Sequence, residues 1–209
     1  MYFVNLPVDN PFIKTGAGVD SLFSRIGPAV DLMVSQYGGR LQETSRLGNM
    51  FYAANQAAVT TTVAAATTYT GLCISNPAGG AYNLVIHAAG FKLSVAPAGI
   101  ATLALMGGYS TAGIVTHTTP LVFGTAFASL NFGSGLAPSA LLDSAATIVN
   151  PRVCWPLAGG FTAAALPPDG VAHADIGGAI TIQPGGWCAI YSLTVVVGFG
   201  FFAWTEVPR

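Results

Sequence analysis

The sequence predicts a mainly β protein: a jelly-roll-like antiparallel β-sandwich preceded by an extended N-terminal arm and one or two short helices. Segments rich in Val, Ile and Thr recur along most of the chain, separated by turn sequences such as NPAGG and PGG. Charged residues concentrate in the first 46 positions, whereas the rest is rich in Ala, Thr and Gly. We therefore expect an N-terminal arm with a short helical segment over residues 1–50 and a β-sandwich body over residues 51–209.

The N-terminal segment begins with residues 1–18, which contain two prolines and end in Gly-Ala-Gly. This composition favours an extended arm. In residues 19–39, Leu22, Phe23 and Ile26 stand near helical spacing, which predicts one or two short amphipathic helices. The segment is either a lid that packs on the β body or an arm that anchors the protein to a partner.

The body is predicted as a series of strands joined by turns and loops. In chain order, strands are expected at residues 57–63, 70–75, 82–95, 100–106, 145–149, 151–157, 179–183 and 186–207. Residues 107–138 predict an ordered loop with buried aromatic side chains, and residues 162–175 predict a second loop. Because prolines stand at both ends of residues 151–157, that strand is expected at a sheet edge.

The composition limits the classes of partner. Only 7% of the residues are charged, against about 25% in an average soluble protein, and the formal net charge is −1. The few Lys and Arg residues are scattered, which argues against nucleic-acid binding. The longest charge-free apolar run, residues 193–204, is shorter than the about 20 residues of a transmembrane helix, so no membrane partner is expected. The N-terminus lacks the pattern of a secretory signal, which favours synthesis in the cytoplasm.

The sequence contains no pattern typical of a catalytic or metal site. The histidines and cysteines stand apart from one another: His87, His117, His173, Cys73, Cys154 and Cys188. Asp175 lies near His173, but two donors are fewer than the three or four that metal sites usually need. We expect His87 to be satisfied inside the core or to face a neighbour, and the cysteines to be buried, inert thiols. No enzymatic activity, cofactor or metal is predicted.

The C-terminal strand is apolar on both faces. From Trp187 onward the odd positions form a continuous apolar set, and the even positions become apolar at Val196, Phe202 and Trp204. In an antiparallel sheet with one wet face, one of these sets would be polar. We assign the odd set to the subunit's core and Val196, Phe202 and Trp204 to a subunit interface. The expected assembly is a homo-oligomer, with three copies about an axis favoured.

Three segments carry a resemblance to known proteins: QAAVTTTVAAATTYTGLCISNPAGG, LLDSAATIV and ITIQPGGWCAIYSLTVVVGFGFFAWTEVP. In the spacing of these segments, from about residue 40 to the end, the chain resembles small trimeric capsid decoration (cement) and head-fibre-type structural proteins of tailed bacteriophages. The resemblance implies a virion protein on the capsid surface that stabilises the head by binding the major capsid protein. Docking would use one trimer face or the N-terminal arm, with the arm residues Phe12, Ile13, Leu22, Phe23 and Ile26.

Two alternatives remain at the level of sequence. A head-fibre, tail or baseplate component would use the same kind of apolar subunit contact. A carbohydrate-binding or hydrolytic β-sandwich acting on a host surface belongs to a different class. Its sugar platform would consist of aromatic residues, namely Tyr69, Tyr82, Tyr109, Trp155 and Trp187. Packing in the protein is the favoured explanation for these aromatic residues, because no cluster of Asp, Asn or Arg accompanies them.

Overall fold

The chain divides into two compact units, Met1–Arg40 and Leu41–Arg209. The computed structural model describes residues 25–26, 32–33, 41–109, 115–161 and 171–209. In the first unit, β1 (Arg25–Ile26) pairs antiparallel with β2 (Leu32–Met33). The helices expected over residues 19–39 are therefore wrong at these described positions, where Gly and Pro directly after Ile26 disfavour a helix. The other residues of that prediction lie outside the described part of the chain.

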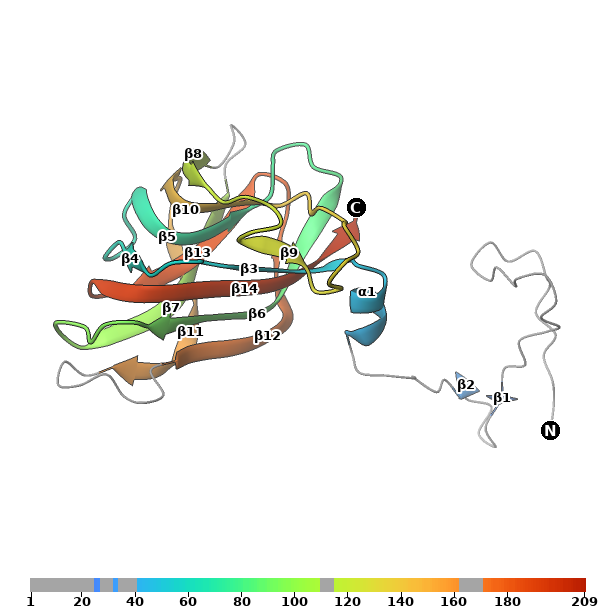
Figure 1. Ribbon diagram of the computed structural model, residues 1–209, viewed down its shortest axis with the longest axis horizontal. Helices are drawn as coiled ribbons and strands as arrows, with labels where there is room; N and C mark the ends of the chain where they lie inside the picture. The colour runs from blue at the N-terminus through green and yellow to red at the C-terminus, as the bar shows by residue number, and fades with distance from the viewer. Residues whose placement is uncertain (1–24, 27–31, 34–40, 110–114, 162–170) are drawn as a thin grey trace. The chain divides into compact units, whose positions relative to one another are not determined.

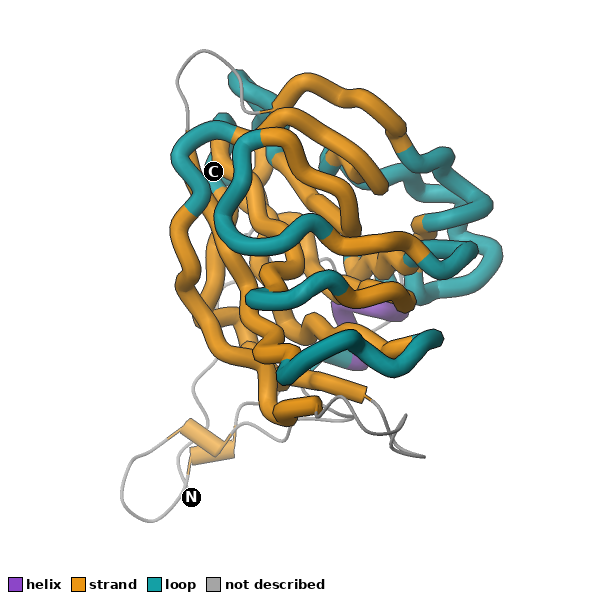
Figure 2. Tube along the Cα trace, turned by 90° about the vertical axis from the view of Figure 1, so that its left-hand side faces the viewer, coloured by secondary structure: helices purple, strands orange, loops and turns teal. Residues whose placement is uncertain are grey.

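The second unit begins with the short helix α1 (Gln42–Arg46) and continues as strands (Figures 1 and 2). These are β3 (Met50–Ala54), β4 (Val59–Thr61), β5 (Thr68–Ser75), β6 (Tyr82–Leu93), β7 (Ala101–Tyr109), β8 (Val115–Pro120), β9 (Phe127–Ser129), β10 (Leu141–Ile148), β11 (Arg152–Phe161), β12 (Val171–Ile182), β13 (Gly186–Ser192) and β14 (Val196–Pro208). Among the described residues, no helix is long and apolar enough to cross a membrane.

The strands form two antiparallel sheets. The β13 sheet has the order β8-β10-β5-β13-β7-β11, and the β14 sheet has the order β11-β12-β6-β14-β3-β9, with β4 also paired to β14. Figure 1 shows β14, in red, between β3 and β6. The predicted mainly β, antiparallel sandwich is confirmed, while a jelly-roll connectivity stays a prediction.

Strand β11 belongs to both sheets. Most of its length pairs with β7, whereas Ala158 pairs with His173 of β12. Within residues 151–157 the described pairs are with β7 alone, so the prediction of a sheet edge is confirmed for that segment, and β11 joins the second sheet only at Ala158. Register shifts on both sides of Pro156 interrupt the regular ladder, and bulged backbone of this kind accommodates a proline inside a sheet.

Parts of the two loops expected from the sequence are also strand. β8 and β9 lie within residues 107–138, and β12 begins at Val171, within residues 162–175. β8 has the sequence VTHTTP and pairs with β10. Its β-branched residues favour an extended backbone, which outweighs the high glycine content of the surrounding segment.

A hydrophobic core fills the space between the two sheets. The β13 sheet contributes buried side chains such as Leu72, Leu105 and Ile190, and the β14 sheet contributes Ile86 and Phe51 among others. A second, smaller cluster lies on the opposite side of the β13 sheet, because strand alternation points Trp187 and Ala189 away from Cys188 and Ile190 of the inter-sheet core. The β13 sheet is therefore covered by apolar groups on both sides.

The residues assigned to a subunit interface belong to this inter-sheet core. Val196 is 1% exposed, and Phe202 and Trp204 are 0% exposed, within the single chain. Trp204 packs against Phe51 with ring centroids 5.8 Å apart. The predicted interface of Val196, Phe202 and Trp204 is therefore wrong, because these side chains are already covered by the subunit's own second sheet.

The error has a structural cause at Trp187. The sequence pattern assigns Trp187, with the other odd positions, to the subunit's core, but Trp187 is buried in the smaller cluster outside the inter-sheet core. The inner positions of both β13 and β14 are the even ones. The odd positions of β14 consequently point out of the sandwich.

Replacing Trp204 by Ala is expected to lower the free energy of unfolding by about 3–5 kcal/mol, because it opens a cavity in the core. Val207→Ala, at a position 45% exposed on the same strand, is the matched control and is expected to change stability by less than about 0.5 kcal/mol. Urea unfolding followed by far-UV circular dichroism, a signal of the backbone, measures the free energy of unfolding of both variants. Equal losses in the two variants would contradict the core assignment.

Candidate functional site

The outward side of β14 is apolar. Its odd positions are Val197, Phe199, Phe201 and Ala203, and Phe199 is 38% exposed. The residues paired with them point to the same side of the sheet. Lys92 pairs with Phe199, Gly90 with Phe201, and Ala88 with Ala203. His173 pairs with Gly90, Ala54 with Phe201, and Tyr52 with Ala203. These residues define the outer face of the β14 sheet.

Glycine at position 90 shapes the centre of this face. A Cβ atom there would lie 2.4 Å from Cε1 of Phe201, so the ring of Phe201 lies directly over the backbone of β6. His173 stacks on Phe201, with ring centroids 5.9 Å apart and an interplanar angle of 20°. The residues beside these rings, such as Ala88 and Ala54, have small side chains. The rings therefore stay accessible to a partner protein.

A second aromatic pair extends the outer face. Tyr52 on β3 meets Phe132 edge to face, with centroids 6.0 Å apart. Phe132 lies in the loop after β9 and is 78% exposed, so the prediction of buried aromatic side chains in residues 107–138 is wrong for this ring. Covering such an exposed phenylalanine ring with another protein removes its apolar surface from water, which is favourable. This part of the face is therefore suited to a protein contact.

An apolar patch at one end of the sandwich adjoins this face. The loop-end patch consists of Val95, Ile100, Leu193 and Val195, which are all at least 50% exposed. Hydrogen bonds join its two loops to the strands: Ser94 N–H donates to the Val197 carbonyl at 2.9 Å, and the Thr194 hydroxyl donates to the Ile100 carbonyl. The patch is thus held on ordered backbone beside β14.

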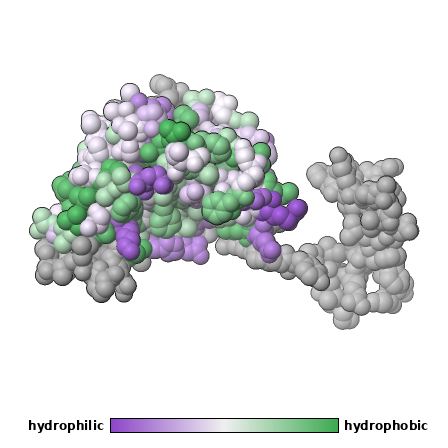
Figure 3. Space-filling view, in the orientation of Figure 1, coloured by the Kyte–Doolittle hydropathy of each residue, from purple (hydrophilic) through white to green (hydrophobic). Residues whose placement is uncertain are grey.

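Few charges interrupt these surfaces. Among the described residues, Lys92 and Asp175 bring charge to the outer face of the β14 sheet. Figure 3 shows hydrophobic and near-neutral residues over most of the visible described surface, with hydrophilic ones in a few small groups. A surface of this kind can hold a partner through buried area and shape, but offers little long-range electrostatic attraction.

The sequence missed this site. Phe199 and Phe201 were assigned to the core with the other odd positions, whereas they lie on the outer face. The sequence correctly predicts a strand with two apolar faces, but it assigns the core face and the outer face to the wrong sets of positions. Of the arm residues, Phe12, Ile13, Leu22 and Phe23 lie outside the described part of the chain, and Ile26 lies in β1.

A histidine–carboxylate pair is the clearest polar feature of the body. His117 Nδ1 donates to Oδ2 of Asp143 at 2.7 Å, and the Asp143 side chain is buried. Burial raises the pKa of Asp143, and the hydrogen bond from His117 lowers it in part. Within the described residues no hydroxyl group hydrogen-bonds to His117.

The other candidate polar residues have structural surroundings. His87 is 9% exposed and its Nε2 lies 2.9 Å from Oγ1 of Thr205, so the ring is buried and hydrogen-bonded within the chain. Tyr69 and Trp187 are buried and Trp155 packs against the inter-sheet core, as the packing interpretation predicts. That interpretation is wrong for Tyr82 and Tyr109, which are 39% and 57% exposed. Cys73 and Cys188 are buried, but Cys154 is exposed at a register shift of β11, so the prediction is wrong for that thiol.

Comparison with known proteins gives no match to a family model, to a curated protein or to a solved structure. The function of this chain is therefore inferred from its own surface and sequence.

The His117→Ala variant is expected to be about 1–3 kcal/mol less stable than the wild type at about pH 8, because it leaves a buried carboxylate without its partner. The loss of His117 removes the hydrogen bond that lowers the pKa of Asp143, so the folded state holds the Asp143 proton to higher pH than the unfolded chain does. A group with a raised folded-state pKa contributes stability at low pH that is lost as the pH rises through that pKa.

The free energy of unfolding of His117→Ala, measured in urea, should therefore increase when the pH falls from about 8 to about 5. The double variant with Asp143→Asn is the control and should lack this increase. The same pH dependence in both variants would show that Asp143 is not its source.

Proposed function

We propose that the protein is a virion structural protein, a capsid decoration (cement) protein that forms a homotrimer and stabilises a phage head by binding the major capsid protein. The outer face of the β14 sheet is the observation that carries this proposal. It places half-exposed aromatic rings and small residues on a rigid sheet with little charge. A protein held permanently on a particle benefits from contacts of this kind, because buried apolar area does not weaken with salt.

The two adjoining apolar surfaces support a closed ring of subunits. In a trimer each subunit presents two different surfaces, one to each neighbour, and the contact closes after three copies. The outer face of the β14 sheet and the loop-end patch are two such surfaces on one chain. Burial of about 800 Å² per partner is the usual size of a stable contact, and apolar area contributes about 25 cal/mol per Å².

The first unit supports a separate docking role. The short unit Met1–Arg40 carries six of the chain's fifteen charged residues, whereas the much longer unit Leu41–Arg209 carries the other nine, so charge is denser in the first unit. In this proposal the β body forms the trimer. The first unit, with Phe12, Phe23 and Ile26, binds the major capsid protein.

Phe199→Asp is expected to convert the trimer into a folded monomer. The new carboxylate lies opposite Lys92 on the neighbouring strand, so it gains a cross-strand ion pair in the monomer but would be buried in the subunit contact. Val153→Asp, at a position 52% exposed on the other sheet, is the matched control and should remain trimeric. Light scattering at micromolar concentration measures the mass, and circular dichroism checks the fold. A Phe199→Asp protein that stays trimeric refutes the assigned contact.

Purified protein is expected to rebind capsids assembled without it and to raise their thermal transition, because a cement protein bridges capsid subunits. Sedimentation with the capsids and calorimetry measure these two effects, and a variant lacking residues 1–40 should form trimers without rebinding. Failure of the full chain to bind contradicts the capsid role. Glycan-array binding through the His173–Phe201 stack would instead favour the carbohydrate-binding class.

A further inference from the structure

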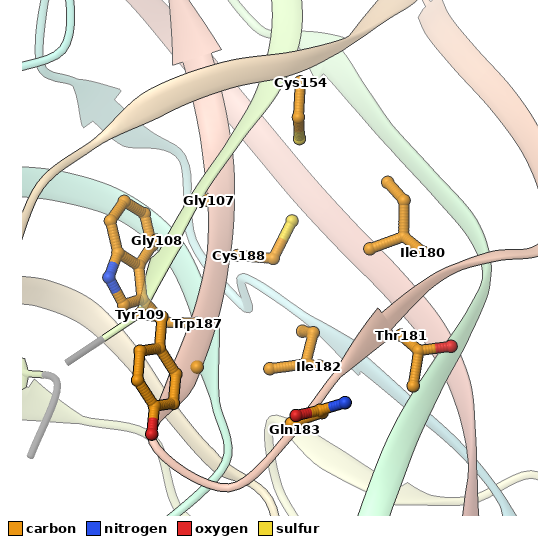
Figure 4. A pocket seen from close by; sticks show the side chains of 11 residues that line it. Gly107, Gly108, Tyr109, Cys154, Ile180, Thr181, Ile182, Gln183, Trp187 and Cys188 are labelled. Atoms are coloured by element: carbon orange, nitrogen blue, oxygen red, sulfur yellow. The ribbon is translucent and has the colours of Figure 1, made fainter. Parts of the chain in front are cut away.

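A cavity of about 360 Å³ opens between the two sheets near the start of β13. Its walls come from β7, β11, β12 and β13, and they include the aliphatic side chains of Ile180 and Ile182. Two of the three cysteines, Cys154 and Cys188, also line it (Figure 4). Figure 4 shows the two thiol side chains facing each other across the cavity. This arrangement was not visible in the sequence, where the two residues stand far apart.

The two cysteines come from strands on either side of β7. Cys188 pairs with Gly107 of β7, and Gly107 pairs on its other side with Arg152 of β11. Cys154 lies at the register shift of β11, where its Sγ lies 3.4 Å from the Leu105 carbonyl oxygen. Since Gly107 has no side chain, no group on β7 at this position separates the two sulfurs.

The two sulfurs are near each other but are poorly placed for a disulfide. Two inter-strand spacings separate β11 from β13, which places the Cα atoms about 9–10 Å apart. A disulfide needs Cα atoms closer than about 7 Å. Both cysteines are free thiols in the structure. The cavity therefore presents a pair of sulfur ligands with a gap between them.

We propose that Cys154 and Cys188 form a two-thiolate binding site for a thiophilic divalent metal ion. Soft thiolate ligands select soft ions, and a linear S–metal–S unit with bonds of about 2.3 Å separates the sulfurs by about 4.6 Å. Such a unit fills a gap that is too long for a sulfur–sulfur bond. No group of three or more His, Cys, Asp or Glu residues occurs in the described part of the chain, so the donor set suits two-coordinate ions rather than tetrahedral zinc.

The charge balance favours a divalent ion. Binding replaces two S–H bonds by two S–metal bonds, as M²⁺ + 2 R–SH → M(SR)₂ + 2 H⁺, and the product is neutral. A monovalent ion would leave one net negative charge beside Ile180 and Ile182, and burial of such a charge is unfavourable.

The test is an anaerobic titration of the full-length reduced protein with HgCl₂ against a competing thiol. We expect one tightly bound ion per subunit, two protons released per ion, and two sulfur ligands in X-ray absorption. Cys154→Ser, at the exposed position, should lower the affinity by at least about 100-fold, because the second thiolate then binds alone. Cys73→Ala is the control, since Cys73 lies outside the inter-sheet core in the smaller cluster, and it should bind as the wild type does. Silver ion should bind more weakly than Hg²⁺.

Three results would overturn the proposal. The first is wild-type affinity in Cys154→Ser, and the second is a bound ion with a single sulfur ligand. The third is a Cys154–Cys188 disulfide formed by hydrogen peroxide in the folded protein and detected by peptide mass mapping, because it would show that the sulfurs approach more closely than two strand spacings allow. Circular dichroism of each variant verifies that a loss of binding is not a loss of folding.

Discussion

The close approach of β14 to the opposite sheet determines which surface of the protein faces outward. Gly200 lies so near the β13 sheet that a Cβ atom on it would be 3.0 Å from Cβ of Leu72 and 3.4 Å from Cγ1 of Ile190. The glycine allows Phe202 and Trp204, on the same side of the strand, to reach the inter-sheet core. Because strand positions alternate, Phe199 and Phe201 must then point outward. The outer face is thus a consequence of how the core is packed.

Much of the architecture could be predicted from local sequence. Thr- and Val-rich segments and Pro-Gly turns predict strands and their ends through backbone preferences that need no knowledge of distant contacts. The prolines of β11 predict a sheet edge, but the continuation of this strand into the second sheet could not be predicted, because it depends on the pairing of Ala158 with His173. The same shift exposes Cys154, which a regular strand in an apolar segment would bury.

The candidate site shows what a strand pattern can and cannot specify. Two apolar faces on β14 predict one core side and one covered side, since a wet face would be polar. Whether the odd or the even positions face the inter-sheet core depends on the cluster in which Trp187 packs. Trp187 packs in the smaller cluster, which sequence alone does not distinguish from the inter-sheet core. The thiol pair depends on Gly107 standing between two strands that are distant in sequence, so it appears only in three dimensions.

The central claim is that copies of this chain cover the outer face of the β14 sheet. Hydroxyl-radical footprinting of the wild type, at protein concentrations below and above assembly, measures this directly for Phe199 and Phe201, with the exposed Val122 as internal reference. The account predicts that oxidation of both phenylalanines falls on assembly while that of Val122 is unchanged. Constant oxidation of Phe199 and Phe201 in an assembled protein would contradict it.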